Sequence, residues 1–284
     1  MIVGRIAQLW RHPVKSMEGE RVERAPIGVN GLLGDRVWAV RDEERGGIRG
    51  AKKIAALMTC KARYADEPSS ATIPAPEISL PNGDRLRADA PDAAARLSAA
   101  LGHKVTLWPL QPASDLAHYQ RGAPDHADVL TELRAIFGRD TDEPLPDFSQ
   151  FPPEIMQYES PPGTYFDVHP LNLLTDATLR RLQAIAPTSV IDVRRFRPNL
   201  VIETGGDGFV EAGWAGRQLR IGSTLIDVGH PCPRCVMITH GFADVPRDTG
   251  LMRTVVREAD QNVGSYATVA QPGEIRVGDS VELI

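Results

Sequence analysis

Cysteine is scarce in this sequence, which holds only Cys60, Cys232 and Cys235 among its 284 residues. An odd and low count does not fit the disulfide framework of a small extracellular protein. The count therefore favours a reducing, cytoplasmic setting, in which clustered free thiols tend to serve metal or redox chemistry.

Long apolar runs and excess positive charge are also missing. No segment reaches the ~18 uninterrupted apolar residues that a membrane-spanning helix requires. Arg5 and Arg11 interrupt the apolar N-terminal stretch, which lacks a small-residue cleavage site, so we expect no secretory signal. The formal net charge of −5 gives no overall attraction to nucleic acid or to an anionic membrane surface.

The composition that remains is that of an ordinary globular protein. Hydrophobic residues make up 42% of the chain and charged residues 24%, which argues against disorder. A chain of 284 residues can bury a sizeable core, and the length favours two domains. The 25 glycines and 23 prolines favour turns and short strands over long helices.

The spacing of apolar residues predicts a mainly β protein with some helices. Helical spacing and capping residues predict helices over residues 92–101, 127–137, 252–259 and, with Asp176 as cap, 176–185. Residues 138–163, rich in Pro, Asp, Glu and Ser, are expected to form a long surface loop. The predicted strands, two of them joined as a hairpin by Pro81-Asn82-Gly83-Asp84, cover residues 3–14, 36–40, 77–80, 85–87, 103–110, 171–174, 200–203, 218–221, 224–228 and 274–283.

The sharpest chemical cluster is His230-Pro231-Cys232-Pro233-Arg234-Cys235, directly after a predicted strand. Two prolines stiffen this loop, which suits a site that must hold a fixed geometry. Arg234 would favour the thiolate form of a neighbouring cysteine by its charge. Because a thiolate is a soft ligand, the cluster is able to bind a metal directly.

Four interpretations of this cluster are open from the residues alone. The two cysteines could simply be buried packing residues. They could form a dithiol–disulfide pair, but such pairs usually open a helix, and residues 236–239 are expected to be extended. A zinc site is a third possibility, although the spacing is not a common zinc pattern; its ligands would be His230, Cys232, Cys235 and His240. In the fourth interpretation, a single thiolate holds the metal of a cofactor.

Several motifs, in the right order along the chain, resemble a MOSC domain preceded by the β-barrel domain that often accompanies it. The motifs of the C-terminal part lie at residues 195–199, 231–236, 246–250 and 272–279, and those of the N-terminal part at residues 12–16 and 34–36. The resemblance covers nearly the whole chain. Its pattern is similar to that of the mitochondrial amidoxime-reducing component and its bacterial counterparts.

The resemblance implies a fold and a cofactor. The expected fold is an N-terminal β-barrel domain over residues 1–112 and a MOSC β-barrel domain with flanking helices over residues 113–284. The expected cofactor is molybdenum–molybdopterin, with Cys235 as the metal ligand and Cys232 as a buried neighbour. Cys235, His169 and Asp167 are the implied catalytic residues. Lys, Arg and hydroxyl groups suit the phosphate of a pterin, and the implied cofactor-binding residues are Lys15, Ser16, Arg36, Arg197, Asn199, Arg234, Asp248 and Thr249.

The implied activity is the reduction of N-hydroxylated compounds such as hydroxylamines, amidoximes and N-oxides, by oxygen-atom abstraction at molybdenum. The chain has no spare cysteines for a [2Fe–2S] domain, so a separate ferredoxin, flavin reductase or similar protein is expected to supply electrons. The other expected partner is a small-molecule substrate, without nucleic acid or membrane. An alternative function is that of a carrier, which hands on the cofactor or sulfur through Cys235 without turnover. A structural zinc protein is a third hypothesis.

Overall fold

Seven strands drawn from both ends of the chain close into a barrel in the computed structural model, which describes residues 1–284. The first strand, β1 (Ile2–Arg11), pairs with β11 on one side and β16 on the other, and its Leu9 lies opposite Leu200. An additional short strand, β2 (Glu20–Val22), pairs with β1 outside the ring. The order around the barrel is β11 (Leu200–Thr204), β10 (Leu171–Thr175), β14 (Asn262–Gln271), β13 (Thr224–Pro233), β12 (Gln218–Ile221), β16 (Ser280–Leu283) and β1.

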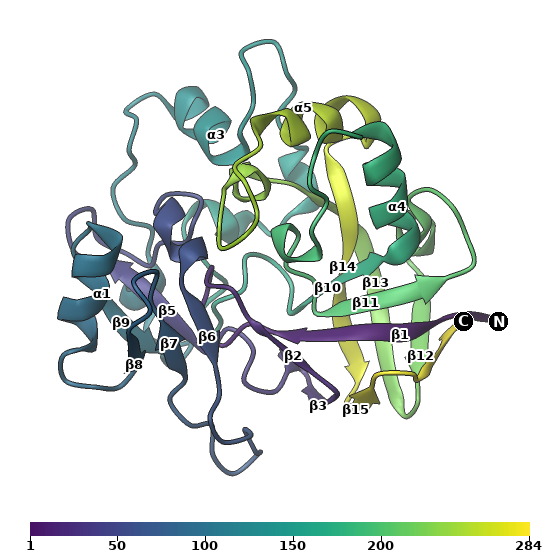
Figure 1. Ribbon diagram of the computed structural model, residues 1–284, viewed down its shortest axis with the longest axis horizontal. Coiled ribbons are helices and arrows are strands. Elements are labelled where there is room, and N and C mark those ends of the chain that lie inside the picture. Colours follow the sequence, from purple (N-terminus) through teal and green to yellow (C-terminus); the bar gives the residue numbers. More distant parts are fainter.

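The barrel is filled by aliphatic side chains and covered on one side by two helices. Ile6, Leu173 and Ile226 belong to its buried interior. The only parallel pair in the barrel is β10–β11, so its connection must cross over, and α4 (Asp176–Ile185) makes that crossover. A second helix, α5 (Thr249–Glu258), packs beside α4 and shares a core with it, and Figure 1 shows both on the same side of the barrel.

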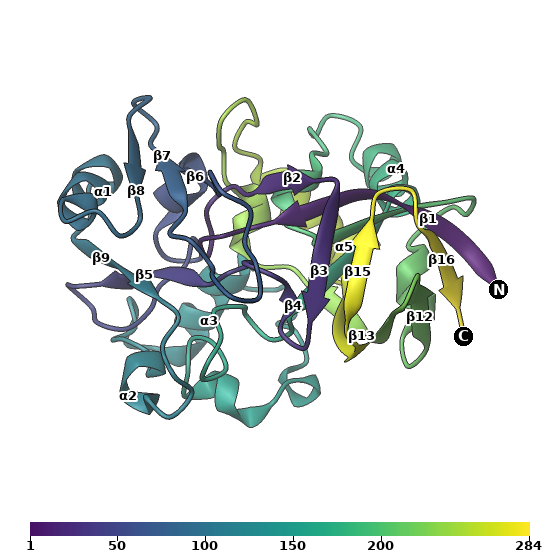
Figure 2. The same cartoon turned by 90° about the horizontal axis from the view of Figure 1, so that it is seen from below.

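The N-terminal part beyond β1 and β2 supplies one helix, α1 (Ala93–Leu101), and the strands of three small sheets, one of which also includes a strand from the C-terminal end of the chain. Figures 1 and 2 show α1 and the strands β5 to β9 gathered at the opposite end of the molecule from the two termini. Its core also includes Met237 and Phe242 from the C-terminal half, so the segment after Cys235 is anchored in the N-terminal part. The small sheets are β15 (Gly273–Arg276) with β3 (Arg24–Gly28) and β4 (Gly31–Leu32); β5 (Trp38–Asp42) with β9 (Val105–Pro109); and β6 (Lys61–Arg63) with β7 (Glu77–Ser79) and β8 (Arg85–Arg87).

The connection between the two parts carries α2 (Leu116–Tyr119) and α3 (Val129–Phe137). Asp128 caps the start of α3, and Gly138 ends it with a left-handed φ of 62°. The expected loop over residues 138–163 is confirmed, since it contains no α-helix or strand, only two short 3₁₀ turns. The 3₁₀ turns of the whole chain are η1 (Ala55–Thr59), η2 (Phe148–Gln150), η3 (Pro153–Met156), η4 (Val193–Arg195), η5 (Val210–Trp214) and η6 (Val236–Thr239).

The predicted mainly β fold with flanking helices is confirmed, and three local predictions need correction. The cap of α4 is Thr175, whose side chain accepts a hydrogen bond from the Thr178 backbone, rather than Asp176. The single strand expected over residues 274–283 is divided into β15 and β16 by a turn at Gly278, which has a φ of 93°. Residues 236–239, expected to be extended, form the 3₁₀ turn η6 because this segment leaves the sheet at Pro233. No helix in the structure combines the length and the apolar character that crossing a membrane would require.

Candidate functional site

A cavity of about 470 Å³ lies where the N-terminal part meets the barrel. A volume of this size is typical of sites for small molecules and cofactors. The cavity brings together most of the side chains that the sequence singles out, from segments far apart in the chain. Those lining it are Lys15, Ser16, Arg36, Asp167, His169, Arg197, Asn199, Arg234 and Cys235.

Asp248 and Thr249 are not brought to this cavity. The Asp248 carboxylate instead accepts a hydrogen bond from the Leu251 backbone N–H at 3.1 Å and caps α5. Thr249 is the first residue of that helix. An Asp that precedes a helix is a common cap, so the local sequence serves α5 rather than the cavity.

Strained backbone presents three of the polar side chains. Ser16, Arg36 and Arg197 have positive φ angles of 69°, 50° and 53°, a region that residues with a Cβ rarely adopt. The Ser16 Oγ accepts a hydrogen bond from the Ala51 N–H at 2.9 Å, which fixes the loop after β1 against the loop after β5. Gly50 permits this approach, because a Cβ at that position would lie 2.6 Å from the Ser16 Oγ.

Lys15 and Lys52 hold Asp167 between them. The Lys15 Nζ is buried and donates to Asp167 Oδ1 at 2.6 Å and to the Tyr165 carbonyl at 2.9 Å. The Lys52 Nζ lies 2.9 Å from Asp167 Oδ2. Burial alone would raise the pKa of Asp167, but the two ammonium groups hold that pKa well below its ordinary value. Burial lowers the pKa of Lys15; burial also opposes the charged form of Lys52, but the neighbouring groups, with Asp167 first among them and Glu159 after it, together raise the pKa of Lys52.

Lys52 is a site residue that sequence reasoning missed. It lies in the run Gly50-Ala51-Lys52-Lys53, which has no strand or helix pattern to show which way a lysine points. The only signal was a pair of lysines after a glycine. The neighbouring Lys53 also lines the cavity, but it forms ion pairs with Asp125 and Glu132.

Arg197 supplies a donor that no protein group satisfies. Its Nη1 donates to the Met17 carbonyl, whereas its buried Nη2 has no partner. Burial, followed by the charge of Arg36, lowers the pKa of Arg197 to about 9. Arg36 itself donates to Asp35, to Asn199 Oδ1 at 3.3 Å and to the Arg197 carbonyl at 3.3 Å. An unsatisfied buried guanidinium N–H points to a site for an anion or another acceptor.

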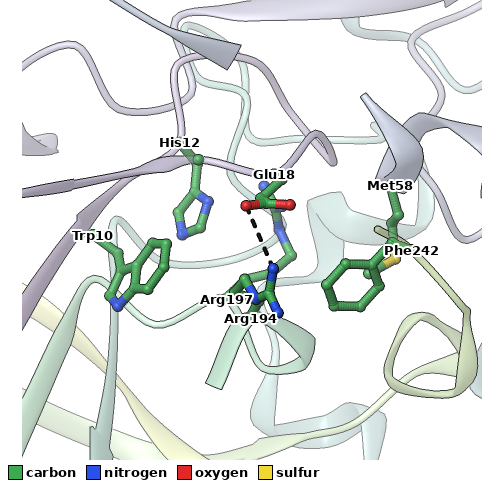
Figure 3. A pocket seen from close by; sticks show the side chains of 8 residues that line it. Trp10, His12, Glu18, Met58, Arg194, Arg197 and Phe242 are labelled. Atoms are coloured by element: carbon green, nitrogen blue, oxygen red, sulfur yellow. Dashed lines mark ion pairs between the residues drawn. The ribbon is translucent and has the colours of Figure 1, made fainter. Parts of the chain in front are cut away.

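Arg197 also borders a second, much smaller cavity of about 10 Å³, drawn in Figure 3. This space is about that of one water molecule, so it cannot hold a substrate or cofactor. Burial, together with the charges of Arg197 and Arg36, lowers the pKa of His12 well below its ordinary value, so the ring is neutral. Glu18 and Arg194 form an ion pair at 3.8 Å across it. The labelled lining residues are Trp10, His12, Glu18, Met58, Arg194, Arg197 and Phe242.

Cys235 lies in the short segment between β13 and the turn that follows it. Its side chain is half-buried and lines the cavity, directly before the 3₁₀ turn η6. Cys232 is buried on β13, and burial raises the pKa of its thiol. Cys60 is buried in the N-terminal core, as expected for a packing residue. The two clustered cysteines therefore differ: only Cys235 combines exposure with a place on the cavity wall at a rigid loop.

Arg234 lines the cavity, but its guanidinium N–H groups donate hydrogen bonds to backbone carbonyls of the protein. Its Nε donates to the Val263 carbonyl at 2.7 Å and its Nη1 to the Phe196 carbonyl at 2.9 Å. Gly264 allows this packing, because a Cβ there would lie 3.0 Å from the Arg234 Nη2 and 2.5 Å from the Leu173 carbonyl. Arg234 thus holds the cysteine loop against β14. The structure places the side chain where it fixes Cys235 rather than where it faces a ligand.

A cluster of rings borders the cavity near Cys232. The rings of His169, His230 and Tyr266 lie 5.3–5.5 Å apart, centroid to centroid, and Phe151 lies 5.1 Å from His230. Burial, followed by the neighbouring His230, lowers the pKa of His169, so its ring is mostly uncharged at neutral pH. The resemblance of short motifs indicated His169, but the arrangement of the three rings depends on the β10–β14 and β13–β14 pairings.

The residues proposed for zinc do not form a metal site. No group of three or more His, Cys, Asp and Glu side chains in the structure is arranged to hold a metal ion. His240, one of the four, bonds through Nε2 to the Ala51 carbonyl at 3.0 Å. Instead, the cavity is lined by two thiols, of which only Cys235 is partly exposed, beside basic side chains.

The chain is similar to known proteins over nearly its whole length. The model of the MOSC N-terminal beta barrel domain matches residues 3–109, and that of the MOSC domain matches residues 161–282. The predicted boundary at residue 112 falls between these two ranges. The human mitochondrial amidoxime-reducing component 1 is 26% identical over 99% of this chain and 83% of its own length. The human component 2 is 27% identical over 98% and 83%.

Two solved structures also show partial similarity. The YUAD protein from Bacillus subtilis has a TM-score of 0.45 and 11% identity, over 99% of this chain and 94% of that chain. YiiM from Escherichia coli has a TM-score of 0.33 and 18% identity, over 41% of this chain and 54% of that chain.

Proposed function

Because this chain belongs to the proteins that join a MOSC N-terminal beta barrel domain to a MOSC domain, we propose that it is a molybdenum-cofactor-dependent oxidoreductase reducing N-hydroxylated compounds. One observation carries the proposal: the half-buried thiol of Cys235 lines the same cavity as several basic side chains. The relatives named as amidoxime-reducing components align over nearly the full chain, which supports this substrate class.

The residues present fit a molybdenum–pterin cofactor. A soft metal ligand is supplied by the Cys235 thiolate, and no second cysteine competes for it, because Cys232 is buried with a raised pKa. Lys15, Lys52 and Arg197 lie together in the cavity, and the unpartnered Nη2 of Arg197 is free to meet an acceptor. Ammonium and guanidinium groups are the usual partners of a phosphate.

When bound, the cofactor would supply the two-electron reduction that breaks the N–O bond of the substrate. The chain supplies the surroundings. Cys235 would bind the metal; Lys15, Lys52 and Arg197 would bind the phosphate; Ser16 would form a hydrogen bond with the pterin. Asn199 is fully buried, and its side chain accepts from Arg36 and donates to the Trp10 carbonyl, so it would position Arg36. Arg234, through its bonds to the Val263 and Phe196 carbonyls, would keep the thiolate loop in place.

Reduction of an N–O bond to water also consumes protons. His169 is the cavity residue suited to pass them, because the ordinary pKa of imidazole is close to neutral. Its pKa is lowered by burial and by His230, so the ring is mostly neutral at neutral pH and would hold an added proton only weakly, which suits a group that passes protons on. Asp167 keeps its charge through Lys15 and Lys52, so its role here is to position these two lysines rather than to donate a proton.

The test is metal and pterin analysis combined with turnover. Protein from a host that makes molybdopterin should hold about one molybdenum per chain and should reduce hydroxylamine with an artificial electron donor. Protein from a host that lacks the pterin pathway is the control and should do neither. Stoichiometric zinc without pterin would overturn the proposal. Retained turnover with tightly held metal favours the enzyme over a carrier, whereas transfer of the cofactor to an acceptor protein without turnover favours the carrier.

A further inference from the structure

Helix α3 has an apolar face that no core uses. Val129, Leu133, Ile136 and Phe137 recur at the i, i+4, i+7 and i+8 positions of one helical face. All four line the 470 Å³ cavity, and no residue of the helix is fully buried. None of them belongs to any of the four hydrophobic clusters that make up the interior of the protein. An amphipathic face normally packs on a core, so its position over a cavity calls for another explanation.

The loop after α3 continues this apolar surface. Phe148, Phe151 and Ile155 are half-buried, line the cavity and lie outside the core clusters. Phe137 and Phe148 are 5.5 Å apart, and Phe148 and Phe151 are 6.4 Å apart, between ring centroids. Phe151 in turn lies edge-on to His230, on the strand that carries Cys232. A row of aromatic rings therefore leads from α3 to the cysteine loop. We call Leu133, Ile136, Phe137, Phe148, Phe151 and Ile155 the apolar roof.

Polar contacts at the two ends of α3 hold the roof in place. At the start, Lys53 forms an ion pair with Glu132 of the helix and another with Asp125. Beyond the end, the buried Arg139 donates from its Nη2 to the Arg234 carbonyl at 3.1 Å, next to Cys235. The apolar side chains are thus not needed to attach the helix, and they are free to face a ligand.

We propose that the apolar roof is a substrate subsite that binds an aromatic or bulky aliphatic substituent on the carbon next to the N–O group. This inference rests on the proposed function and defines its substrate class. The polar end of the cavity, at Lys15 and Arg197, is suited to the charged cofactor, and the roof is an apolar wall of the same cavity that an uncharged substituent can reach. A ring entering here removes apolar surface from water and meets phenylalanine edges, both favourable contacts.

Leu133 and Leu130 provide a matched pair of test positions. They lie one turn apart on α3, but Leu133 lines the cavity whereas Leu130 is 51% exposed and does not. The holoprotein is assayed with benzamidoxime and with acetamidoxime, which carries a methyl group in place of the ring. Leu133→Ala and Phe151→Ala should raise KM for benzamidoxime about tenfold with little change in kcat. The values for acetamidoxime should change less than about twofold, and Leu130→Ala should behave as the unchanged protein for both. Equal losses for both substrates, or equal effects at Leu130 and Leu133, would overturn the subsite.

A binding measurement separates this inference from the proposed function. Benzamide and acetamide lack the N–O bond, and ligand-observed NMR reports their binding without any turnover. The unchanged protein should bind benzamide more tightly than acetamide, and Phe151→Ala should remove most of that difference. If no N-hydroxylated compound is reduced but this difference is found, the subsite stands and the proposed reaction fails. If reduction is found without any preference for benzamide, the reaction stands and the subsite fails.

Discussion

The Nζ of Lys15 donates a hydrogen bond to Oδ1 of Asp167 at 2.6 Å, although 152 residues separate the two in sequence. The contact joins the loop after β1 to the segment before β10, so it spans the junction of the two parts of the molecule. The two side chains carry opposite charge in a shared cavity, where Lys15 is buried and Asp167 is partly exposed, so the Lys15 ammonium group depends on Asp167 for its counter-charge.

Replacing Asp167 should make the stability of the protein less dependent on pH. Its pKa is depressed in the folded state, so its contribution is present above the ordinary carboxyl pKa of about 4 and is lost as pH falls toward the folded value. Asp167→Asn lacks this contribution and leaves Lys15 and Lys52 without their counter-charge. Chemical denaturation of both proteins from about pH 2 to about pH 7, in steps of about 1 pH unit, measures the difference in the free energy of unfolding. It should be largest near neutral pH and shrink in acid; a difference that grows as pH falls would contradict the assignment.

Removing one basic side chain from the cavity should weaken cofactor retention without unfolding the protein. Each charge-assisted hydrogen bond contributes on the order of 1.5–3 kcal/mol, so Lys15→Ala or Arg197→Ala should weaken retention roughly ten- to a hundredfold. Lys52→Ala should act in the same direction. Pterin and molybdenum content after dialysis measures retention. Arg87, whose side chain is 64% exposed and pairs with Asp89, offers the control variant Arg87→Ala, which should retain full content. Unchanged pterin in all three cavity variants would show that the phosphate binds elsewhere.

The two clustered cysteines should respond differently to serine. Cys235→Ser should abolish reduction of hydroxylamine and alter the molybdenum spectrum, because a hydroxyl is a poor soft ligand and is rarely ionised. Cys232→Ser should keep much of the activity, since Cys232 borders the cavity but is buried beside Tyr266, whereas Cys235 is partly exposed. A dithiol pair would instead lose function equally in both variants, because a disulfide needs both sulfur atoms. An active Cys235→Ser protein with normal molybdenum content would remove the central claim.

Alkylation of the native protein should distinguish the three thiols. In protein made without the pterin pathway, Cys235 is half-buried on the cavity wall and should react first with iodoacetamide at pH 8. Cys60 is fully buried, and burial raises its pKa to about 11, so on the order of one thiol in a thousand is ionised at that pH. Mass spectrometry of timed samples gives the order of labelling. Labelling of Cys60 before Cys235 would show that the cavity does not expose the Cys235 thiol as described.

The local sequence determined much of what is seen along the chain. Helix α1 begins after Asp92 and ends at Gly102, and the β7–β8 hairpin turns at Asn82-Gly83, because these residues set the backbone angles of their own neighbourhood. The prolines around Cys232 were expected to stiffen a loop after residue 228, but β13 continues through them to Pro233, where pairing with β14 extends the strand. The resemblance of short motifs then named Lys15, Arg197 and Cys235, which do line one cavity.

Only the tertiary structure determined which of these side chains line the same cavity, and which further residues line it with them. The pairing of β1 with β11 brings Lys15 and Arg197 to one cavity, and no local pattern specifies that pairing. Lys52 reaches Asp167, and Leu133 faces the cavity rather than a core, for the same reason: the contacts form between segments distant in sequence. Conversely, Asp248 fits a sequence motif but caps the start of α5, where its carboxylate accepts a hydrogen bond from the nearby Leu251 backbone N–H. Backbone angles depend mainly on adjacent residues, so local sequence predicts helices, turns and caps. The composition of a site depends on how the whole barrel packs against the N-terminal sheets, so it is determined only in the folded chain.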